Sequence, residues 1–137
     1  MNESEKAWLA AAIDGEGTLG IYKKKKSYYQ TIILICNSSL KFVEKAREIT
    51  NKGSISIHSR PKGYLPSYEW HVSKQGDCLE ILTAILPYLI IKREKAERIL
   101  LYLKFRKQKG LYTRHGIVER RFVEGTQSEI KEILQIL

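Results

Sequence analysis

Apolar side chains in the first half of the chain switch from helical to alternating spacing. The helical set comprises Trp8, Leu9, Ala12 and Ile13. It predicts a helix with an N-cap at Ser4 that runs to about Asp14 and is ended by Gly15 and Gly17. Residues 18–22 alternate, and residues 28–36 are rich in β-branched and aromatic side chains. These two segments predict a hairpin with lysines 23–26 at its tip.

A second helix is expected over residues 40–51, with Asn37, Ser38 or Ser39 as its cap and residues 51–53 closing it. The clearest strand pattern follows, because Ile55 and Ile57 alternate with polar side chains, namely Ser54, Ser56, His58 and Arg60. After a loop with Pro61, Gly63 and Pro66, a similar strand alternates Tyr68, Trp70 and Val72 with Ser67, Glu69, His71 and Ser73. The two strands predict a hairpin with one apolar and one hydrogen-bonding face.

Helical spacing returns at Leu79, Leu82 and Leu86 and predicts a helix over residues 76–86, which Pro87 breaks. A longer basic helix is expected over 88–107, a loop over 110–116, and a last helix from Thr126. The order is αββαββα with helical additions, an α+β fold with one four-stranded antiparallel sheet and helices on one face. We expect a single domain over 1–137, divided into a first helix (1–17), two hairpins with an intervening helix (18–73) and C-terminal helices (74–137).

Composition is that of a soluble domain and excludes a membrane span, because no apolar run approaches 18 residues. The polar N-terminus does not resemble a signal peptide, and Cys36 and Cys78 are expected to be reduced thiols. Net charge is +9 and is concentrated in residues 18–36 (+4) and 92–121 (+8). Two basic stretches favour nucleic-acid binding, although lysine-rich stretches can also be plain solvated faces.

The end of the first helix carries unusual chemistry. Asp14 and Glu16 lie where the helix dipole disfavours acids, beside two glycines and after the small run Ala10-Ala11-Ala12. If this helix packs against its own copy, the carboxylates of two chains converge and suit Mg²⁺. The alternative is structural: Asp14 closes the helix and Glu16 is an exposed turn residue.

The run Leu9-Ala10-Ala11-Ala12-Ile13-Asp14-Gly15-Glu16-Gly17 resembles the signature of the LAGLIDADG homing endonucleases. It departs from it by Ala at 11 and 12, Gly at 15 and Glu at 16. The resemblance covers most of the chain, because the αββαββα order is also that family's fold. It implies homodimerisation, since family members with one motif copy act as dimers. The motif helix would then supply the dimer interface through Trp8, Leu9, Ala11, Ala12 and Asp14.

The resemblance also implies site roles. Glu16 would be the metal-binding catalytic acid, and the Gly15 carbonyl would be a further metal ligand. Asn37 ends the second strand, where the family often places a group that holds the nucleophilic water. Lys92 follows residues 86–89, where the family often has a lysine that stabilises phosphate charge, and Arg93 could take that role. Asn37 is equally well explained as a helix cap, and Lys92 as one of many phosphate-contacting lysines.

The resemblance further implies that the sheet is a saddle laid in the major groove. Parity then selects the DNA-facing side chains: Thr18, Tyr22, Lys24, Lys26, Gln30, Ile32, Leu34, Ser54, Ser56, His58, Arg60, Glu69 and His71. Arg, Gln and His suit base edges, whereas the lysines and the basic stretch from 92, Arg93 included, suit phosphate. Ile32 and Leu34 either meet thymine methyls or show that the register is off by one. His58 and His71 could equally be plain surface histidines.

The expected function is site-specific, Mg²⁺-dependent double-strand cleavage (Mn²⁺ in substitution) of a near-palindromic DNA target of about 20 base pairs, leaving short 3′ overhangs. The alternative is a non-cutting binder, such as an intron-RNA maturase or a DNA-binding regulator. We expect double-stranded DNA and a second copy of the chain as partners, with intron RNA as an alternative and no membrane. We also expect the chain to be intron-encoded and to come from a thermophilic source. It would be located in the cytoplasm at the nucleoid in a prokaryote, or in an organelle in a eukaryote.

Overall fold

The computed structural model describes residues 1–25 and 28–108, so the expectations for Lys26, for the loop 110–116 and for the last helix lie outside the described residues. Its elements are α1 (Glu3–Glu16), β1 (Gly17–Lys25), β2 (Tyr28–Asn37), α2 (Leu40–Thr50), β3 (Ser54–His58), β4 (Ser67–Val72), α3 (Gln75–Ile85), the 3₁₀ turn η1 (Leu86–Tyr88) and α4 (Arg93–Gln108). Within the described residues, no helix is both long and apolar enough to cross a bilayer.

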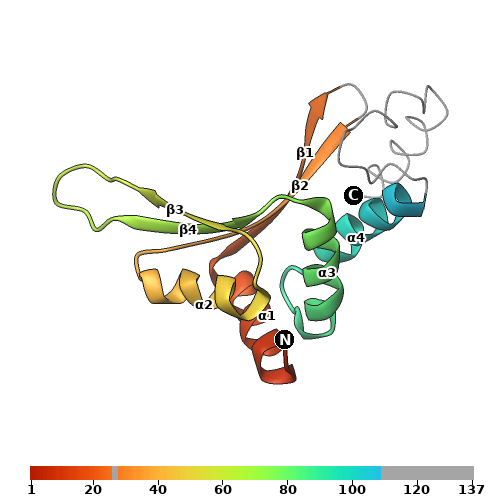
Figure 1. Cartoon of the computed structure of the whole chain (residues 1–137), viewed down its shortest axis with the longest axis horizontal. Coiled ribbons are helices and arrows are strands. Elements are labelled where there is room, and N and C mark those ends of the chain that lie inside the picture. Colours follow the sequence, from red (N-terminus) through yellow and green to blue (C-terminus); the bar gives the residue numbers. More distant parts are fainter. Residues whose placement is uncertain (26–27, 109–137) are drawn as a thin grey trace.

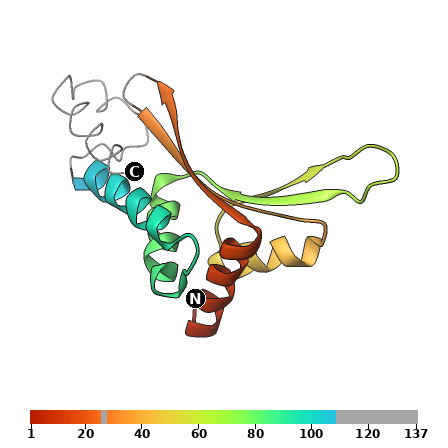
Figure 2. The ribbon, with the colours of Figure 1, turned by 180° about the vertical axis from the view of Figure 1, so that it is seen from behind.

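The four strands form one twisted antiparallel sheet in the order β1-β2-β4-β3. Figures 1 and 2 show all helices on the same side of this sheet, and the β3–β4 hairpin projecting beyond α2. The predicted fold class is therefore confirmed. One face of the sheet packs on the helices. The opposite face, called the free face below, is covered by no described element.

The core lies between the sheet and the helices. Alternate residues of the strands point into it and are fully buried: Leu19, Ile33, Ile35 and Trp70. The Trp70 indole N–H donates to the Lys52 carbonyl at 2.9 Å, directly after α2. The turn from α2 to β3 needs positive φ, at Asn51 (54°) and at Gly53 (84°). Residues 51–53 therefore close α2 as predicted, since Asn and Gly tolerate the left-handed region best.

The ends of α1 differ from the prediction. The N-cap is Asn2, not Ser4: its side chain accepts the Glu5 backbone N–H at 2.8 Å, and the Glu5 carboxylate accepts the Asn2 N–H at 2.9 Å. This reciprocal capping box satisfies two donors that a serine at position 4 would leave open. At the other end the helix includes Gly15 and stops at Glu16, because Gly17 is extended (φ −102°) and β1 begins there at once.

The predicted helix over 88–107 begins five residues later than expected. Residues 86–88 form η1, and α4 starts at Arg93, with the Ala96 N–H donating to the Lys92 carbonyl at 2.9 Å. Leu89 is buried, whereas Ile90 and Ile91 are among the most exposed apolar side chains described. Residues 90–92 are non-helical because their backbone N–H groups are directed to Asp14 at the end of α1.

Candidate active site and nucleic-acid interface

The last turn of α1 presents Glu16 to solvent. Glu16 is exposed and makes no hydrogen bond or ion pair within the described part of the chain. The chain turns directly from the helix into β1 because position 17 has no side chain. A Cβ on Gly17 would lie 2.7 Å from the Ile13 Cα and 2.8 Å from its carbonyl oxygen. Gly17 thus lets β1 start against the helix and fixes the backbone next to the Glu16 carboxylate.

Asp14, by contrast, is fully engaged. Its two carboxylate oxygens accept the backbone N–H groups of Ile90 at 2.8 Å and Lys92 at 2.9 Å. Partial burial opposes ionisation, but the N–H groups of Ile90, Lys92 and Ile91 and the charge of Lys92 outweigh it and hold the Asp14 pKa below its usual value. Asp14 therefore ties the loop before α4 to the end of α1, with both carboxylate oxygens already hydrogen-bonded to that loop.

Lys92 adds a second link between these elements. Its ammonium donates to the Asp14 carbonyl at 2.8 Å. The last turn of α1 contains no basic residue of its own, so Lys92 supplies the positive charge that a helix C-terminus favours. Arg93 lies elsewhere: it pairs with Glu97 along α4 at 3.2 Å, and both side chains are about half exposed. The structure therefore brings Lys92, and not Arg93, to the end of α1.

Asn37 ends β2 close to this region in register, because Ile35 pairs with Gly17 two residues earlier. Its side-chain oxygen accepts the Ser39 N–H at 2.8 Å, at the start of α2, where Ser39 makes no side-chain cap of its own. Asn37 is therefore not the N-cap of α2, which is Ser39; its side chain instead binds the N–H of the residue at the cap position. No described contact joins Asn37 to Glu16 or Lys92.

A divalent cation would find only part of a site in one chain. The donors at the end of α1 are all oxygens, which suits Mg²⁺. The Glu16 carboxylate and the C-terminal carbonyls of the helix, Gly15 among them, would fill part of a six-coordinate shell and leave the remaining positions to water, phosphate or another carboxylate. Among the described residues, no group of three or more His, Cys, Asp and Glu is arranged to hold a metal. The donor chemistry at the end of α1 therefore fits Mg²⁺, with Glu16 as the one free side-chain carboxylate there among the described residues.

The expected dimer interface is corrected in part. Leu9 and Ala12 are buried in the chain's own core and are not available to a second chain. Trp8 packs on α2, with its ring 5.3 Å from that of Phe42, and Asp14 serves the loop before α4. Ala11 remains exposed. It shares the uncovered face of α1 with other small residues at helical spacing, namely Ser4, Ala7 and Gly15.

Strand register confirms the predicted parity of the sheet. Thr18 pairs with Leu34, Tyr22 with Gln30, and Leu34 in turn with His71. On the outer hairpin, Ser54 pairs with His71 and Ser56 with Glu69. Because paired residues in an antiparallel sheet share a face, these side chains and His58 all lie on the free face. Ile32 and Leu34 belong there too, half-buried, while Ile33 and Ile35 are fully buried opposite. The register was therefore not off by one.

The tips of the hairpins depart from simple alternation. The β1–β2 register shifts between Lys23 and Lys25, so Lys24 lies at an irregularity in the strand pairing. Its side chain is exposed. Arg60 lies just beyond the end of β3 and is also exposed. Tyr22 is 54% exposed, and its ring covers Gly20, where a Cβ would come within 2.5 Å of the ring. The exposed cations Lys24 and Arg60 therefore lie near the hairpin tips, and the Tyr22 ring lies over Gly20.

Glu69 has the densest polar contacts on the free face. One carboxylate oxygen lies 3.6 Å from both His58 Nε2 and His71 Nδ1, and the other accepts from the Cys36 thiol at 3.8 Å. Burial of Cys36 and the adjacent Glu69 charge raise the pKa of the thiol, which therefore keeps its proton.

No protein-family model and no curated protein matches this sequence. Solved structures match over nearly its whole length. I-CvuI in complex with its target has a TM-score of 0.63 at 17% identity, over 98% of this chain and 96% of that one. The archaeal intron-encoded I-Vdi141I complexed with DNA has a TM-score of 0.64 at 13% identity, over 96% and 84%. The LAGLIDADG homing endonuclease I-LtrWI, bound to target DNA, has 0.63 at 24%, over 97% and 43%.

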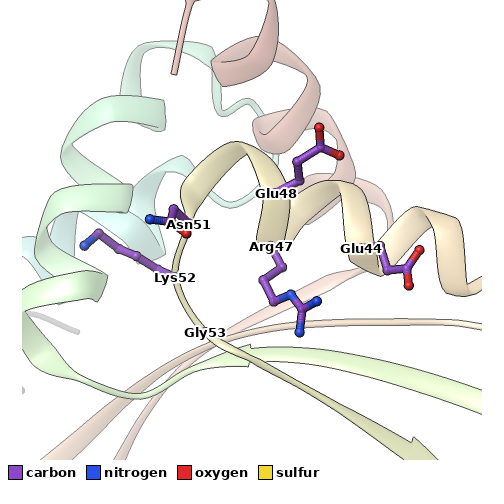
Figure 3. A pocket seen from close by; sticks show the side chains of 6 residues that line it. All are labelled: Glu44, Arg47, Glu48, Asn51, Lys52 and Gly53. Carbon is purple, nitrogen blue, oxygen red and sulfur yellow. The ribbon is translucent and has the colours of Figure 1, made fainter.

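This chain has the fold of the LAGLIDADG homing endonucleases. At these identities the likeness is one of fold. Two features of this chain have side chains suited to a function. They are the exposed acid Glu16 at the end of α1 and the polar free face of the sheet. The pocket in Figure 3 is not a third: it holds about 440 Å³ between α2 and the turn to β3, and its lining is charged and open. Of that lining, Lys52 is already bound to Asp77 and Glu80 of α3.

The sequence interpretation missed the loop before α4 as a partner of the motif helix. Ile90 contributes through its backbone N–H alone, which no side-chain pattern reveals. A usable signal was nevertheless present. Arg93 and Glu97 form an i,i+4 pair that fits a helix beginning at 93, after the break at Pro87.

Proposed function

We propose that this chain is a metal-dependent, site-specific DNA endonuclease that acts as a homodimer. The observation that carries the proposal is the contrast between two acids at the end of α1. The Asp14 carboxylate is held by two backbone N–H groups, whereas Glu16 is exposed and has no partner among the described residues. A carboxylate without a partner at the negative end of a helix is disfavoured by a few tenths of a kcal/mol, and a bound cation would offset that cost. The DNA-bound neighbours and the polar free face of the sheet support duplex DNA as the substrate.

In this proposal Glu16 and the nearby main-chain carbonyl of Gly15 hold Mg²⁺, or Mn²⁺ in its place. The bound ion would stabilise negative charge on the attacking and leaving oxygens of the phosphodiester. Lys92 is held by Asp14 within reach of the same end of the helix, so its ammonium can lower the energy of the extra phosphate charge. Asn37, at the end of β2, keeps its side-chain amide group available to orient a water molecule.

The dimer follows from the small exposed face of α1. Ser4, Ala7, Ala11 and Gly15 let a second α1 approach closely, because helix separation is set by the side chains at the contact. Such a contact brings two Glu16 carboxylates together and completes a cation site that one chain lacks. The chain covers nearly all of I-CvuI, and in this proposal a second, identical chain supplies the other half of the site. Two saddles would then read a near-palindromic target of about 20 base pairs and cut both strands with short 3′ overhangs.

The decisive experiment compares Glu16→Gln with the wild-type chain. The target is selected from a randomised duplex library by binding in the absence of divalent metal, and cleavage is then measured with added Mg²⁺. We expect Glu16→Gln to bind the selected duplex as tightly as wild type or more tightly and to cut at background rate. Glu48→Gln, an exposed acid on α2, is the matched control and should cut normally. Wild-type cleavage by Glu16→Gln would refute the assignment, and binding without cleavage by the wild-type chain would identify a non-cutting binder.

A further inference from the structure

The free face of the sheet carries one acidic side chain in a setting built for base recognition. Glu69 is the only acid in the described strands. It sits on β4, an inner strand of the sheet, with Cys36 opposite it on β2 and Ser56 opposite it on β3. A carboxylate there cannot face DNA phosphates without repulsion, so in a groove-bound complex it must face the bases.

The neighbours of Glu69 fix its carboxylate along the face. His58 Nε2 and His71 Nδ1 both lie 3.6 Å from one oxygen, and the Cys36 thiol donates to the other. Register places His58 and His71 on opposite sides of Glu69 along the sheet, since His58 pairs with Ser67 and His71 with Ser54. The two rings thus flank the carboxylate and do not chelate a shared ion, in agreement with the lack of a metal cluster among the described residues.

His71 lies directly beside the carboxylate. Its Nδ1 is buried and makes no hydrogen bond among the described residues, and it faces the carboxylate. An ionised carboxylate accepts hydrogen bonds and has none to donate, so Glu69 makes this part of β4 an acceptor site. Donors on the major-groove edge of base pairs are limited to the N4 amino group of cytosine and the N6 amino group of adenine.

We propose that Glu69 forms a base-specific subsite that binds an exocyclic amino group in the major groove, with His58 and His71 as positioning residues. The proposal rests on DNA being the partner, as in the proposed function, but not on cleavage. A duplex bound by two copies would show the preference once in each half-site. The competing explanation is that Glu69 only balances the charge of the two histidines, in which case its removal would strengthen binding to every duplex alike.

The test is selection from the randomised duplex library without divalent metal, using the full-length wild type, Glu69→Gln, Glu69→Leu and the control Glu48→Gln. Wild type should enrich cytosine or adenine at one position of each half-site by about tenfold over the other bases. Glu69→Leu should lose this enrichment for either base. Glu69→Gln should lose cytosine but keep adenine, because an amide binds adenine through both its groups. Glu48→Gln should match the wild-type profile.

The outcomes are separable. An unchanged base profile in Glu69→Leu, with or without a uniform gain in affinity, would overturn the subsite. The wild type could bind the selected duplex without cutting it, while Glu69→Leu loses the base preference. That result would support the subsite and refute the endonuclease. A melting temperature for Glu69→Gln equal to that of wild type confirms that the altered profile does not come from a misfolded sheet.

Discussion

Replacing Asp14 by Asn should weaken the connection between α1 and the loop before α4. The carboxylate accepts two backbone N–H groups, at 2.8 and 2.9 Å, and hydrogen bonds to a charged group contribute about 1.5–3 kcal/mol each. An amide keeps one neutral acceptor and turns an N–H₂ group toward the second donor. The Ile90 bond is open to solvent, which lowers the figure, so we expect a loss of about 2 kcal/mol in the free energy of unfolding at pH 7.

The stabilisation by Asp14 should depend on pH. The folded pKa of Asp14 is lowered from 3.8, so the stabilisation is present above that value and is lost as the pH falls through the folded pKa. Urea unfolding of wild type and Asp14→Asn at pH 7 and near pH 3 should show the difference shrinking at the lower pH. Glu16→Gln is the control, because Glu16 has no described partner, and it should change stability by only a few tenths of a kcal/mol. A gap of equal size at both pH values, or none at pH 7, would contradict the role of the ionised carboxylate.

Two further substitutions test the same end of α1. Lys92→Met should cost about 1 kcal/mol in urea unfolding, through loss of the 2.8 Å bond to the α1 carbonyl, and should abolish cleavage in a Mg²⁺ assay with DNA binding kept; normal cleavage would place the phosphate-facing cation elsewhere. Gly17→Ala should lower the free energy of unfolding by about 2–3 kcal/mol, because the new methyl would lie 2.7 Å from the Ile13 backbone; an unchanged thermal midpoint would show that β1 can move away from the helix.

The sheet was predictable from sequence because alternation and register constrain each other. Once Ile33 and Ile35 face the core, Leu34 must face away, and antiparallel pairing carries that parity to His71 and Ser54. The same reasoning found Glu69 and both histidines on the free face. It could not find their mutual contacts, because those depend on side-chain reach across three strands.

The helix ends were less predictable because tertiary donors and acceptors decide them. Leu89, Ile90 and Ile91 resemble the start of an apolar helical face, yet the N–H groups of Ile90 and Ile91 are directed to Asp14, which in the case of Ile90 is 76 residues away. The motif taken as a whole predicts an interface that includes Leu9 and Ala12, whereas α1 turns both side chains toward its own core. Only Ala11 of that small run faces outward, and one-residue differences of this kind need the packed structure.

The link between Asp14 and residues 90–92 also bears on how the protein is made. The acid at the end of α1 emerges among the first residues synthesised, but the donors that hold the turn arrive only after the whole sheet and α3. Contacts of such long sequence separation form late in folding. A chain interrupted before residue 92 would contain the sheet, Asp14 and Glu16. It would lack the Lys92 contacts that hold the end of α1. Synthesis itself therefore delays an organised site until the sheet that would select its substrate is complete.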